Sequence, residues 1–392
     1  MRIGRTLPPA AAPLPWRQLG AGIAGAFAPE RAIRARQQEI RQAFGVSHVF
    51  LVSSGSAAIA LTLQALKAGS SRTKVVIPAY TCFSVPAAVL KAGLRPVLCD
   101  ITRSTFDFSH DLLERILDDD TLCVIAHHLF GPCDVERTRA LCRPRGIFVI
   151  EDAAQAMGAQ SGGRKLGTMG DAGIFSFGRG KNVTCGSGGA IVTSSSEIAA
   201  AIAEECRSVP FPRPWETVKD FAALVLMAVF IRPWLYWIPA ALPFLRLGET
   251  IFPADVPVKR LSGLKAGLLR GWSQRLARAN RVRADTAAYF SGRLPEMTGN
   301  GCRHPYLRLP IVAATPAARS QLFSESRARG LGMSPAYPAP LSEIPQMRTI
   351  VRGSYPVAQQ VAARLFTVPT HEWLSDRDKA AIAELCSGLR IS

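Results

Sequence analysis

Short apolar runs alternate with amphipathic segments through the first two hundred residues of the chain. The apolar runs have the length of buried strands and cover residues 49–52, 75–78, 96–101, 122–127, 147–150, 175–177 and 190–193. Segments with helical periodicity lie between them, at residues 57–68, 84–92 and 134–145. Because strands alternate with helices from residue 49 to 155, we expect a mainly parallel sheet with helices on both faces.

Helical periodicity also marks the two ends of the chain. An amphipathic helix is expected over residues 29–44, ahead of the first strand. After residue 260 the pattern predicts one strand over 306–313 and helices over 264–289, 316–329, 357–365 and 376–389. With 392 residues the chain is long enough for two domains. We expect a large α/β domain over residues 1–258 and a smaller α+β domain over residues 259–392.

An apolar insertion over residues 215–250 interrupts this pattern. Residues 221–231 are apolar throughout, and Arg232, Pro233 and the aromatic-rich residues 234–238 follow them. The apolar run is too short to cross a bilayer, and the arginine and the prolines break any continuous helix. Two interpretations are open. The insertion is either an interfacial element, with Trp and Tyr beside Arg at the lipid headgroups, or a flap packed on the protein or on a dimer partner.

The charge balance favours anionic partners. The chain has 47 basic and 29 acidic residues, a formal net charge of +18. Phosphorylated small molecules, an anionic membrane surface and nucleic acid all suit this charge. No zinc-binding spacing, RNA-binding signature or clustered basic helix is present, so nucleic acid is excluded from the predicted partners, and no metal site is predicted.

Cysteine use and the amino terminus indicate a cytoplasmic protein. The nine cysteines form no Cys-x-x-Cys pair, and Cys99, Cys123 and Cys142 fall in apolar segments. We therefore expect reduced, buried thiols. The first residues contain no apolar run of the kind found in a signal peptide.

Two residues that follow predicted strands suggest a cofactor site. Asp152 follows the strand over 147–150, and Lys181 follows Gly178 and Gly180 after the strand over 175–177. The carboxyl ends of parallel strands are where open α/β sheets place ligands. A pyridoxal 5′-phosphate site needs such a pair: the lysine forms a Schiff base, and the carboxylate keeps the ring nitrogen protonated. An Asp at a strand end is also a common helix cap, so the pair needs support from elsewhere in the chain.

A serine- and glycine-rich turn supplies a second candidate element. Ser54, Gly55 and Ser56 lie between the first strand and the helix over 57–68. Free N–H groups at a helix start bind phosphate, although simple capping by serine explains the same sequence.

An ordered set of motifs resembles the DegT/StrS-type sugar aminotransferases, which are fold-type I pyridoxal phosphate enzymes that aminate nucleotide-linked keto-sugars. The motifs are SGSAA at 54–58, IPAYT at 77–81, HLFG at 128–131, EDAAQA at 151–156, SF at 176–177, KN at 181–182, GGAIVT at 188–193 and YP at 337–338. The resemblance is strong over residues 35–205 and looser over 260–385. It implies a seven-stranded, mainly parallel sheet in the large domain and a homodimer.

The resemblance also implies roles for single residues. Lys181 would carry the cofactor and Asp152 would pair with its ring nitrogen. Gln155 would lie beside the ring, near its 3-hydroxyl group. The phosphate would be bound by Gly55, Ser56 and Ser176.

The chain departs from the family pattern at three places. Cys82 stands where the family has an aromatic residue that stacks on the ring, and Tyr80 and Phe83 are the predicted replacements. Arg179 and Gly180 replace Pro-Thr, and Arg179 would contact an anionic substrate or form a surface ion pair. The asparagine that a partner subunit supplies to the phosphate is missing, and Lys259 or Arg260 would substitute for it.

The predicted function is transfer of an amino group, from L-glutamate by resemblance, to a nucleotide-linked keto-sugar for surface polysaccharide or related glycans. The enzyme would be cytoplasmic, with contact to the inner face of the membrane through residues 221–245 if the insertion is interfacial. Three alternatives belong to other classes: a pyridoxal phosphate-dependent sugar dehydratase, a non-catalytic regulatory protein of the same fold, and a membrane-bound assembly scaffold. The dehydratase would have histidine in place of Lys181.

Overall fold

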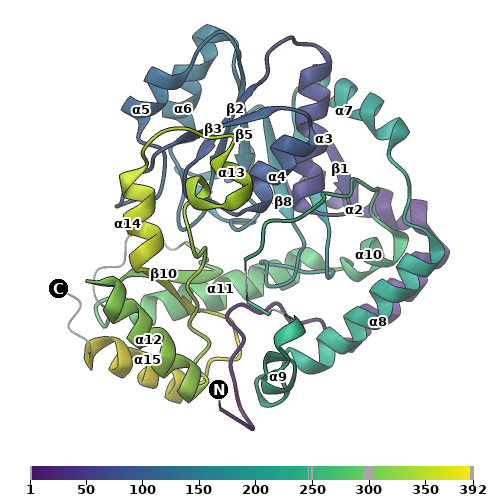
Figure 1. The fold of residues 1–392 in the computed structure, drawn as a ribbon. Coiled ribbons are helices and arrows are strands. Elements are labelled where there is room, and N and C mark those ends of the chain that lie inside the picture. The colour runs from purple at the N-terminus through teal and green to yellow at the C-terminus, as the bar shows by residue number, and fades with distance from the viewer. Residues whose placement is uncertain (1, 246, 249, 295–303, 389–392) are drawn as a thin grey trace.

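A seven-stranded sheet forms the centre of the molecule (Figure 1). The computed structural model describes residues 2–245, 247–248, 250–294 and 304–388. In spatial order the strands are β1 (His48–Val52), β9 (Gly189–Thr193), β8 (Ala172–Ser176), β5 (Phe148–Asp152), β4 (Thr121–His127), β2 (Lys74–Pro78) and β3 (Arg95–Cys99). Each expected strand of the large domain is present, which confirms the α/β fold class.

Six strands run in the same direction, so their carboxyl ends lie at one edge of the sheet. β9 pairs antiparallel with both β1 and β8, and all other neighbours in the sheet pair in parallel. β9 is therefore antiparallel to the other six strands of this sheet. Gly189, at the start of β9, lies against the turn after β1: a Cβ atom there would stand 2.3 Å from the carbonyl oxygen of Ser54. Only glycine permits this close approach.

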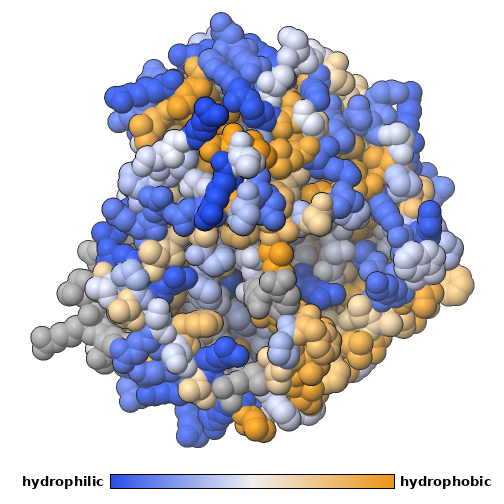
Figure 2. Space-filling view, viewed as in Figure 1, coloured by the Kyte–Doolittle hydropathy of each residue, from blue (hydrophilic) through white to orange (hydrophobic). Residues whose placement is uncertain are grey.

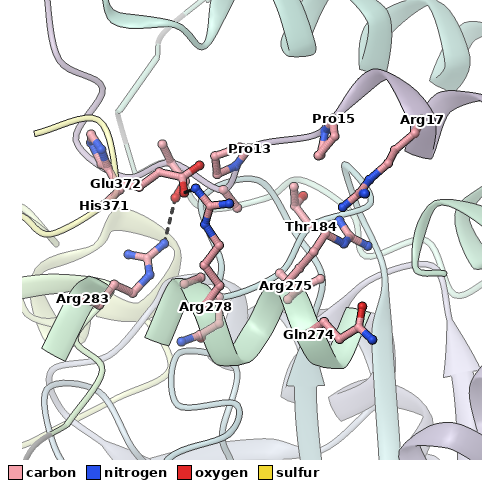
Figure 3. A pocket seen from close by; sticks show the side chains of 15 residues that line it. Pro13, Pro15, Arg17, Thr184, Gln274, Arg275, Arg278, Arg283, His371 and Glu372 are labelled. Carbon is pink, nitrogen blue, oxygen red and sulfur yellow. Dashed lines mark hydrogen bonds and ion pairs between the residues drawn. The ribbon is translucent and has the colours of Figure 1, made fainter. Parts of the chain in front are cut away.

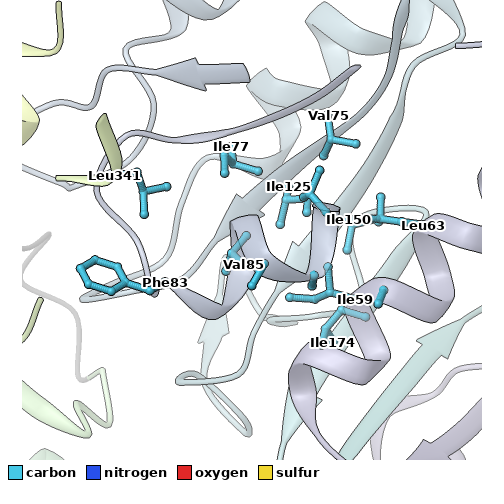
Figure 4. Packing of buried hydrophobic residues seen from close by; sticks show 14 of the residues in the cluster. Ile59, Leu63, Val75, Ile77, Phe83, Val85, Ile125, Ile150, Ile174 and Leu341 are labelled. Atoms are coloured by element: carbon cyan, nitrogen blue, oxygen red, sulfur yellow. The ribbon is translucent and has the colours of Figure 1, made fainter. Parts of the chain in front are cut away.

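Alternate residues of each strand pack into cores on opposite faces of the sheet. On β4, Ile125 joins the core beneath α3 (Gly55–Ala68), α4 (Ser84–Lys91) and α7 (Ser196–Ser208), shown in Figure 4. Val124 joins the core on the other face, beneath α5 (His110–Ile116) and α6 (Val135–Cys142). A third core lies under α1 (Trp16–Phe27), α2 (Pro29–Phe44) and α10 (Gly263–Leu268). The helix expected over 134–145 is α6 followed by a 3₁₀ turn, η1 (Arg143–Arg145).

The carboxyl-terminal part packs around its own small sheet. β10 (Arg308–Val312) pairs antiparallel with β11 (Leu365–Pro369). The remaining elements are the hairpin of β6 (Gln160–Ser161) and β7 (Arg164–Lys165), η3 (Leu341–Glu343), α11 (Trp272–Phe290), α12 (Pro316–Arg329), α13 (Pro345–Arg348), α14 (Pro356–Arg364) and α15 (Asp376–Gly388). The end expected at residue 389 lies outside the described residues.

The single helix expected over 264–289 is wrong, because the segment forms two helices, α10 and α11. Gly271 separates them with a left-handed backbone at φ 66°. β11 and α1 were not expected from the pattern. The domain boundary at 258/259 stays a prediction: α10, beyond it, packs in the core under α1 and α2, whereas Leu7 packs in the carboxyl-terminal core.

The amino-terminal segment joins distant parts of the chain. The Thr6 N–H donates to the carbonyl of Pro233 at 2.8 Å, and the Leu7 N–H donates to that of Gly330 at 2.9 Å. Nε2 of His371 lies 2.8 Å from the carbonyl oxygen of Pro8. The segment is therefore bound both to the apolar insertion and to the carboxyl-terminal core.

The apolar insertion forms α8 (Pro214–Phe230), α9 (Pro233–Ala240) and the 3₁₀ turn η2 (Pro243–Leu245). The helix breaks at Arg232 and Pro233, as expected. Leu224 and Ala228 of α8 are buried, whereas none of the residues of α9 is. An apolar surface over α8 and α9 results, visible at the lower right of Figure 2. Among the described residues, no helix has the length and apolar character needed to cross a membrane.

Candidate active site

The structure brings Asp152 and Lys181 to one cavity. Asp152 is the last residue of β5, and Lys181 lies in the turn that follows the neighbouring parallel strand β8. In that turn Gly180 adopts φ 71°, and the Lys181 N–H donates to the carbonyl of Gly178 at 3.2 Å. The cavity has a volume of about 230 Å³. Of the predicted site residues, those that line it are Gly55, Ser56, Asp152, Gln155, Ser176 and Lys181.

Burial shifts the pKa of both the lysine and the aspartate. Burial lowers the pKa of Lys181, and the nearby charges of Cys82 and Asp152 oppose that shift. The neutral amine, which is the nucleophilic form, is thereby favoured. Burial raises the pKa of Asp152, and the Ala154 N–H, which donates to its Oδ1 at 3.0 Å, and the charge of Lys181 counteract the rise. Among the described residues that amide is the only hydrogen-bond donor to this carboxylate, so it has acceptor capacity left for a cation in the cavity.

The start of α3 forms one end of the cavity. Ser54 caps the helix, because its Oγ accepts from the Ala57 N–H at 3.0 Å. The next two residues, Gly55 and Ser56, present their N–H groups at the positive end of the helix dipole. A Cβ atom at position 55 would stand 3.1 Å from the Cβ of Ser176, so glycine lets the helix start approach the end of β8. Capping and anion binding are thus compatible at this turn.

Gln155 connects the cavity to the carboxyl-terminal part of the chain. Its Nε2 donates to the hydroxyl of Tyr337 at 2.8 Å. The hydroxyl of Tyr80 donates to the backbone carbonyl of Tyr337 at 3.2 Å. Tyr337 itself lines the cavity, so the distant YP motif of the sequence forms part of its wall.

Neither of the predicted ring-contact residues lines the cavity. Tyr80 is fully buried and bonded to Tyr337, and Phe83 packs in the core at the start of α4. Cys82, between them in the sequence, does line it. Backbone geometry explains the difference, because consecutive residues of this turn point in different directions.

Two histidines at the end of β4 were given no role by the sequence analysis. Nδ1 of His127 lies 2.8 Å from the Oγ1 of Thr81, while its Nε2 is buried without a hydrogen-bond partner among the described residues. Burial lowers the pKa of His127 to about 3, so the ring is neutral. His127 lies in register with Asp152 on β5 and lines the cavity. A polar residue at the end of a parallel strand was the available signal.

His128 and Glu151 form a structural pair behind the cavity. Nε2 of His128 lies 2.9 Å from Oε2 of Glu151, and its Nδ1 accepts from the Cys133 N–H at 3.1 Å. Burial raises the pKa of Glu151, but the hydrogen bonds from His128 and from the backbone of Gly170 and Gly167 outweigh it and hold the pKa below its usual range. The pair fixes the loop that follows β7.

The three basic residues with predicted anion contacts lie outside the cavity wall. Arg179 is exposed and has no ion pair among the described residues. Nζ of Lys259 binds Glu216 at 2.5 Å. Arg260 donates to the carbonyls of Val209 and Cys206 at 3.1 and 2.7 Å. Lys259 and Arg260 therefore have partners within this chain, and their predicted contact with a partner subunit's phosphate is untested.

The residues of the cavity fit pyridoxal phosphate. A buried amine, a carboxylate with free acceptor capacity and a helix start that offers N–H groups match the aldehyde, the ring nitrogen and the phosphate of that cofactor. The sheet and this cavity define a fold-type I, pyridoxal phosphate-dependent enzyme. The sequence profile of the DegT/DnrJ/EryC1/StrS aminotransferase family matches residues 27–215. Residues 27–215 of the chain thus match this family of sugar aminotransferases, which confirms the expected family resemblance, enzyme class and cofactor.

Known proteins resemble the chain over almost its whole length. It is 28% identical over 360 residues, covering 89% of this chain and 86% of the relative, to the UDP-N-acetyl-3-dehydro-α-D-glucosamine 3-aminotransferase of Acidithiobacillus ferrooxidans. The structure of Helicobacter pylori PseC, an aminotransferase of pseudoaminic acid biosynthesis, has a TM-score of 0.78, 16% identity and coverage of 98% and 99%. Escherichia coli GDP-4-keto-6-deoxy-D-mannose-3-dehydratase with bound hydrated pyridoxal phosphate has a TM-score of 0.77, 17% identity and coverage of 98% and 100%. The two structures show the shared fold.

Proposed function

We propose that the protein transfers an amino group from L-glutamate to a nucleotide-linked keto-sugar, for the synthesis of surface polysaccharide or a related glycan. One observation carries the proposal: Lys181, Asp152 and the start of α3 meet in a single cavity. The relative from Acidithiobacillus ferrooxidans is named for a UDP-linked keto-sugar, which supports this substrate class. The net charge of +18 suits a substrate with two phosphate groups.

Six residues of the cavity have a defined task in this proposal. Nζ of Lys181 would hold the cofactor, Asp152 would bind the ring nitrogen, and Gln155 would lie beside the ring. The phosphate would be bound by Gly55, Ser56 and Ser176. When bound, pyridoxal phosphate supplies an electron sink for the carbon that loses its proton.

Lys181 also moves the proton. Its amine has a lowered pKa, so it is available as a base once the amino donor has displaced it from the cofactor. Nζ would take the proton from Cα of L-glutamate in the first half-reaction. In the second half-reaction it would return a proton to the sugar carbon that receives the amino group. The products are 2-oxoglutarate and the amino-sugar, in equal amounts.

A sugar dehydratase with the same fold is the second candidate, because one of the similar structures is such an enzyme. Dehydration removes water from the sugar and adds no nitrogen to it. Lys181 favours amino transfer, since the resemblance places histidine at this position in the dehydratases.

A coupled assay separates the two reactions. We expect the purified protein with pyridoxal phosphate to convert UDP- or GDP-linked keto-sugars to amino-sugars, with one 2-oxoglutarate formed per sugar and ping-pong kinetics. Reactions with L-alanine or L-glutamine in place of L-glutamate test the donor. A sugar product that has lost water and carries no nitrogen would contradict the proposal.

We further propose that the apolar insertion attaches the protein to an anionic membrane surface. The outward side chains of Leu226, Trp234 and Phe244 are 57%, 57% and 75% exposed. Each large apolar side chain removed from water contributes about 1.5–3 kcal/mol. Arg232 lies between the two helices and has no ion pair among the described residues, so it is available to lipid phosphates. Apolar insertion and electrostatic attraction together give stable peripheral attachment.

Vesicle sedimentation tests this attachment. We expect the protein to sediment with vesicles that contain phosphatidylglycerol, and substitution of Leu226, Trp234 and Phe244 by glutamate to leave it in the supernatant. The matched control carries glutamate at three exposed apolar positions elsewhere, Ile3, Leu112 and Phe323.

The homodimer implied by the resemblance is part of the same proposal. If the intact protein stays in the supernatant and removal of residues 221–245 dissociates the dimer in sedimentation velocity, the insertion is an interface between copies. The membrane attachment would then be wrong.

A further inference from the structure

A second cavity lies next to the turn that carries Lys181, on the side opposite the candidate active site. Its volume is about 220 Å³, and Asn182, Val183 and Thr184, the residues directly after Lys181, form part of its wall. The opposite walls are the amino-terminal segment at residues 11–17 and the first three turns of α11 (Figure 3). Neither Lys181 nor Asp152 lines this second cavity, so it is separate from the candidate active site.

The side chains in this cavity carry an excess of positive charge. Four arginines and one carboxylate, that of Glu372, line it. Arg278 pairs with Glu372 at 3.2 Å. Arg283 is buried and donates to the carbonyls of Leu307 and Ala11 at 3.0 and 2.7 Å, which gives it a structural role.

Apart from the buried Arg283, Arg17 and Arg275 are the arginines of this cavity that have no ion pair among the described residues. They point toward each other beside Thr184 (Figure 3). Arg275 donates from Nη2 to the carbonyl of Leu268 at 2.7 Å, while its Nε is buried and has no hydrogen-bond partner in the part of the chain that the structure describes. Neither guanidinium has an acidic partner among the described residues. Burial, together with the charges of Arg17 and Arg36, lowers the pKa of Arg275 to about 10, as expected for a cation that lacks a nearby anion.

We propose that Arg17 and Arg275 bind a phosphate-type oxyanion in this second cavity, either free phosphate or the phosphate of a nucleotide. Guanidinium groups bind such oxyanions with paired, charge-assisted hydrogen bonds. The cavity is large enough for one phosphate or diphosphate group, and Arg17 is exposed at its entrance. A bound anion would neutralise two like charges that otherwise repel each other.

An anion bound in the second cavity would stabilise the turn that carries Lys181. Nδ2 of Asn182 donates to Oδ1 of Asn280 on α11 at 2.9 Å, and Nδ2 of Asn280 donates to the carbonyl of Met157 at 2.9 Å. Through these bonds α11 supports both the residue after Lys181 and the loop after Asp152. An anion held between α11 and the amino-terminal segment tightens the same contacts, so the site acts as a binding site for a stabilising effector.

Calorimetry and thermal melting of the protein loaded with pyridoxal phosphate test the proposal, since the cofactor already fills its own phosphate site. We expect inorganic phosphate to bind and to raise the melting temperature in a phosphate-free buffer of constant ionic strength. The double variant Arg17→Gln, Arg275→Gln should weaken binding by about tenfold or more, because several charge-assisted hydrogen bonds are lost. Arg281→Gln, an exposed arginine on the same helix, is the matched control and should bind like wild type.

Separate titrations with phosphate and UDP distinguish the two sources of the anion. If UDP binds more tightly than phosphate and this binding is lost in the double variant, the site binds a nucleotide. If phosphate binds as tightly as UDP, or more tightly, the site binds free phosphate. Absence of phosphate and UDP binding in wild type, or equal loss of binding in Arg281→Gln, would overturn the proposal. If the double variant melts at a lower temperature without ligand, the ligand-dependent rise in its melting temperature is compared with that of wild type.

Discussion

Replacement of Lys181 by alanine should abolish amino transfer while leaving the fold intact. The lysine is the proposed covalent attachment of the cofactor and the base that moves the proton. A general base alone contributes about 10²–10⁴-fold to the rate, and loss of the attachment adds to that effect. Lys181 lies in a turn and its side chain lines a cavity, so its removal leaves no core unfilled. Turnover, visible absorbance of the cofactor and circular dichroism measure the three expected results.

The variant Lys181→Arg is the control for charge. Arginine places a positive charge near Asp152 but forms no Schiff base, so it should be as inactive as alanine. Amino transfer at the wild-type rate in Lys181→Ala would show that another residue holds the cofactor, and the site assignment would be wrong.

Replacement of Asp152 by asparagine should leave the cofactor bound and slow amino transfer by about a thousandfold or more. A neutral amide does not stabilise a protonated ring nitrogen, and a thousandfold loss corresponds to about 4 kcal/mol of transition-state stabilisation. Asparagine has the same shape and its side-chain oxygen still accepts the bond that the Ala154 N–H donates to Asp152, so the turn after β5 should be kept. Single-turnover kinetics with L-glutamate measure the effect on the proton transfer itself.

The variant Asp152→Glu restores the charge and should recover part of the lost rate. A purely structural role of Asp152 predicts the opposite order, because the longer side chain disturbs the turn more than asparagine does. A rate for Asp152→Asn within tenfold of wild type would show that Asp152 is not the partner of the ring nitrogen.

The sheet was predictable because its strands are buried on both faces and read as continuous apolar runs. β4 is buried at all seven positions, and the sequence analysis found it at almost its full length. β11 was missed because its five buried residues directly follow α14 with no turn residue between them. The break between α10 and α11 depends on one residue, Gly271, whose left-handed backbone the helical pattern does not reveal.

Residues of the cavity could be predicted where a residue type suited to the chemistry follows the end of a strand. Asp152 and Lys181 satisfy both conditions, and Gly55 and Ser56 open a helix directly after a strand. The direction of a side chain inside a turn is not encoded in this way, so Cys82 lines the cavity where Tyr80 and Phe83 were expected.

The second cavity had no signal in the sequence. Arg17 and Arg275 are 258 positions apart (275 minus 17), and neither belongs to a motif. Only the folded chain shows that their guanidinium groups approach each other.

The contacts of the amino-terminal segment have a consequence for synthesis on the ribosome. Residues 6–8 are among the first to be made, yet their partners are Pro233, Gly330 and His371. Translation at about 5–20 residues per second takes on the order of tens of seconds to reach the last of these. During that time the large sheet has its full sequence available, whereas the amino-terminal segment has no completed site to occupy. The native fold is therefore completed only when nearly the whole chain has emerged, and a ribosome-bound chain stopped before residue 330 should leave its first residues open to proteases.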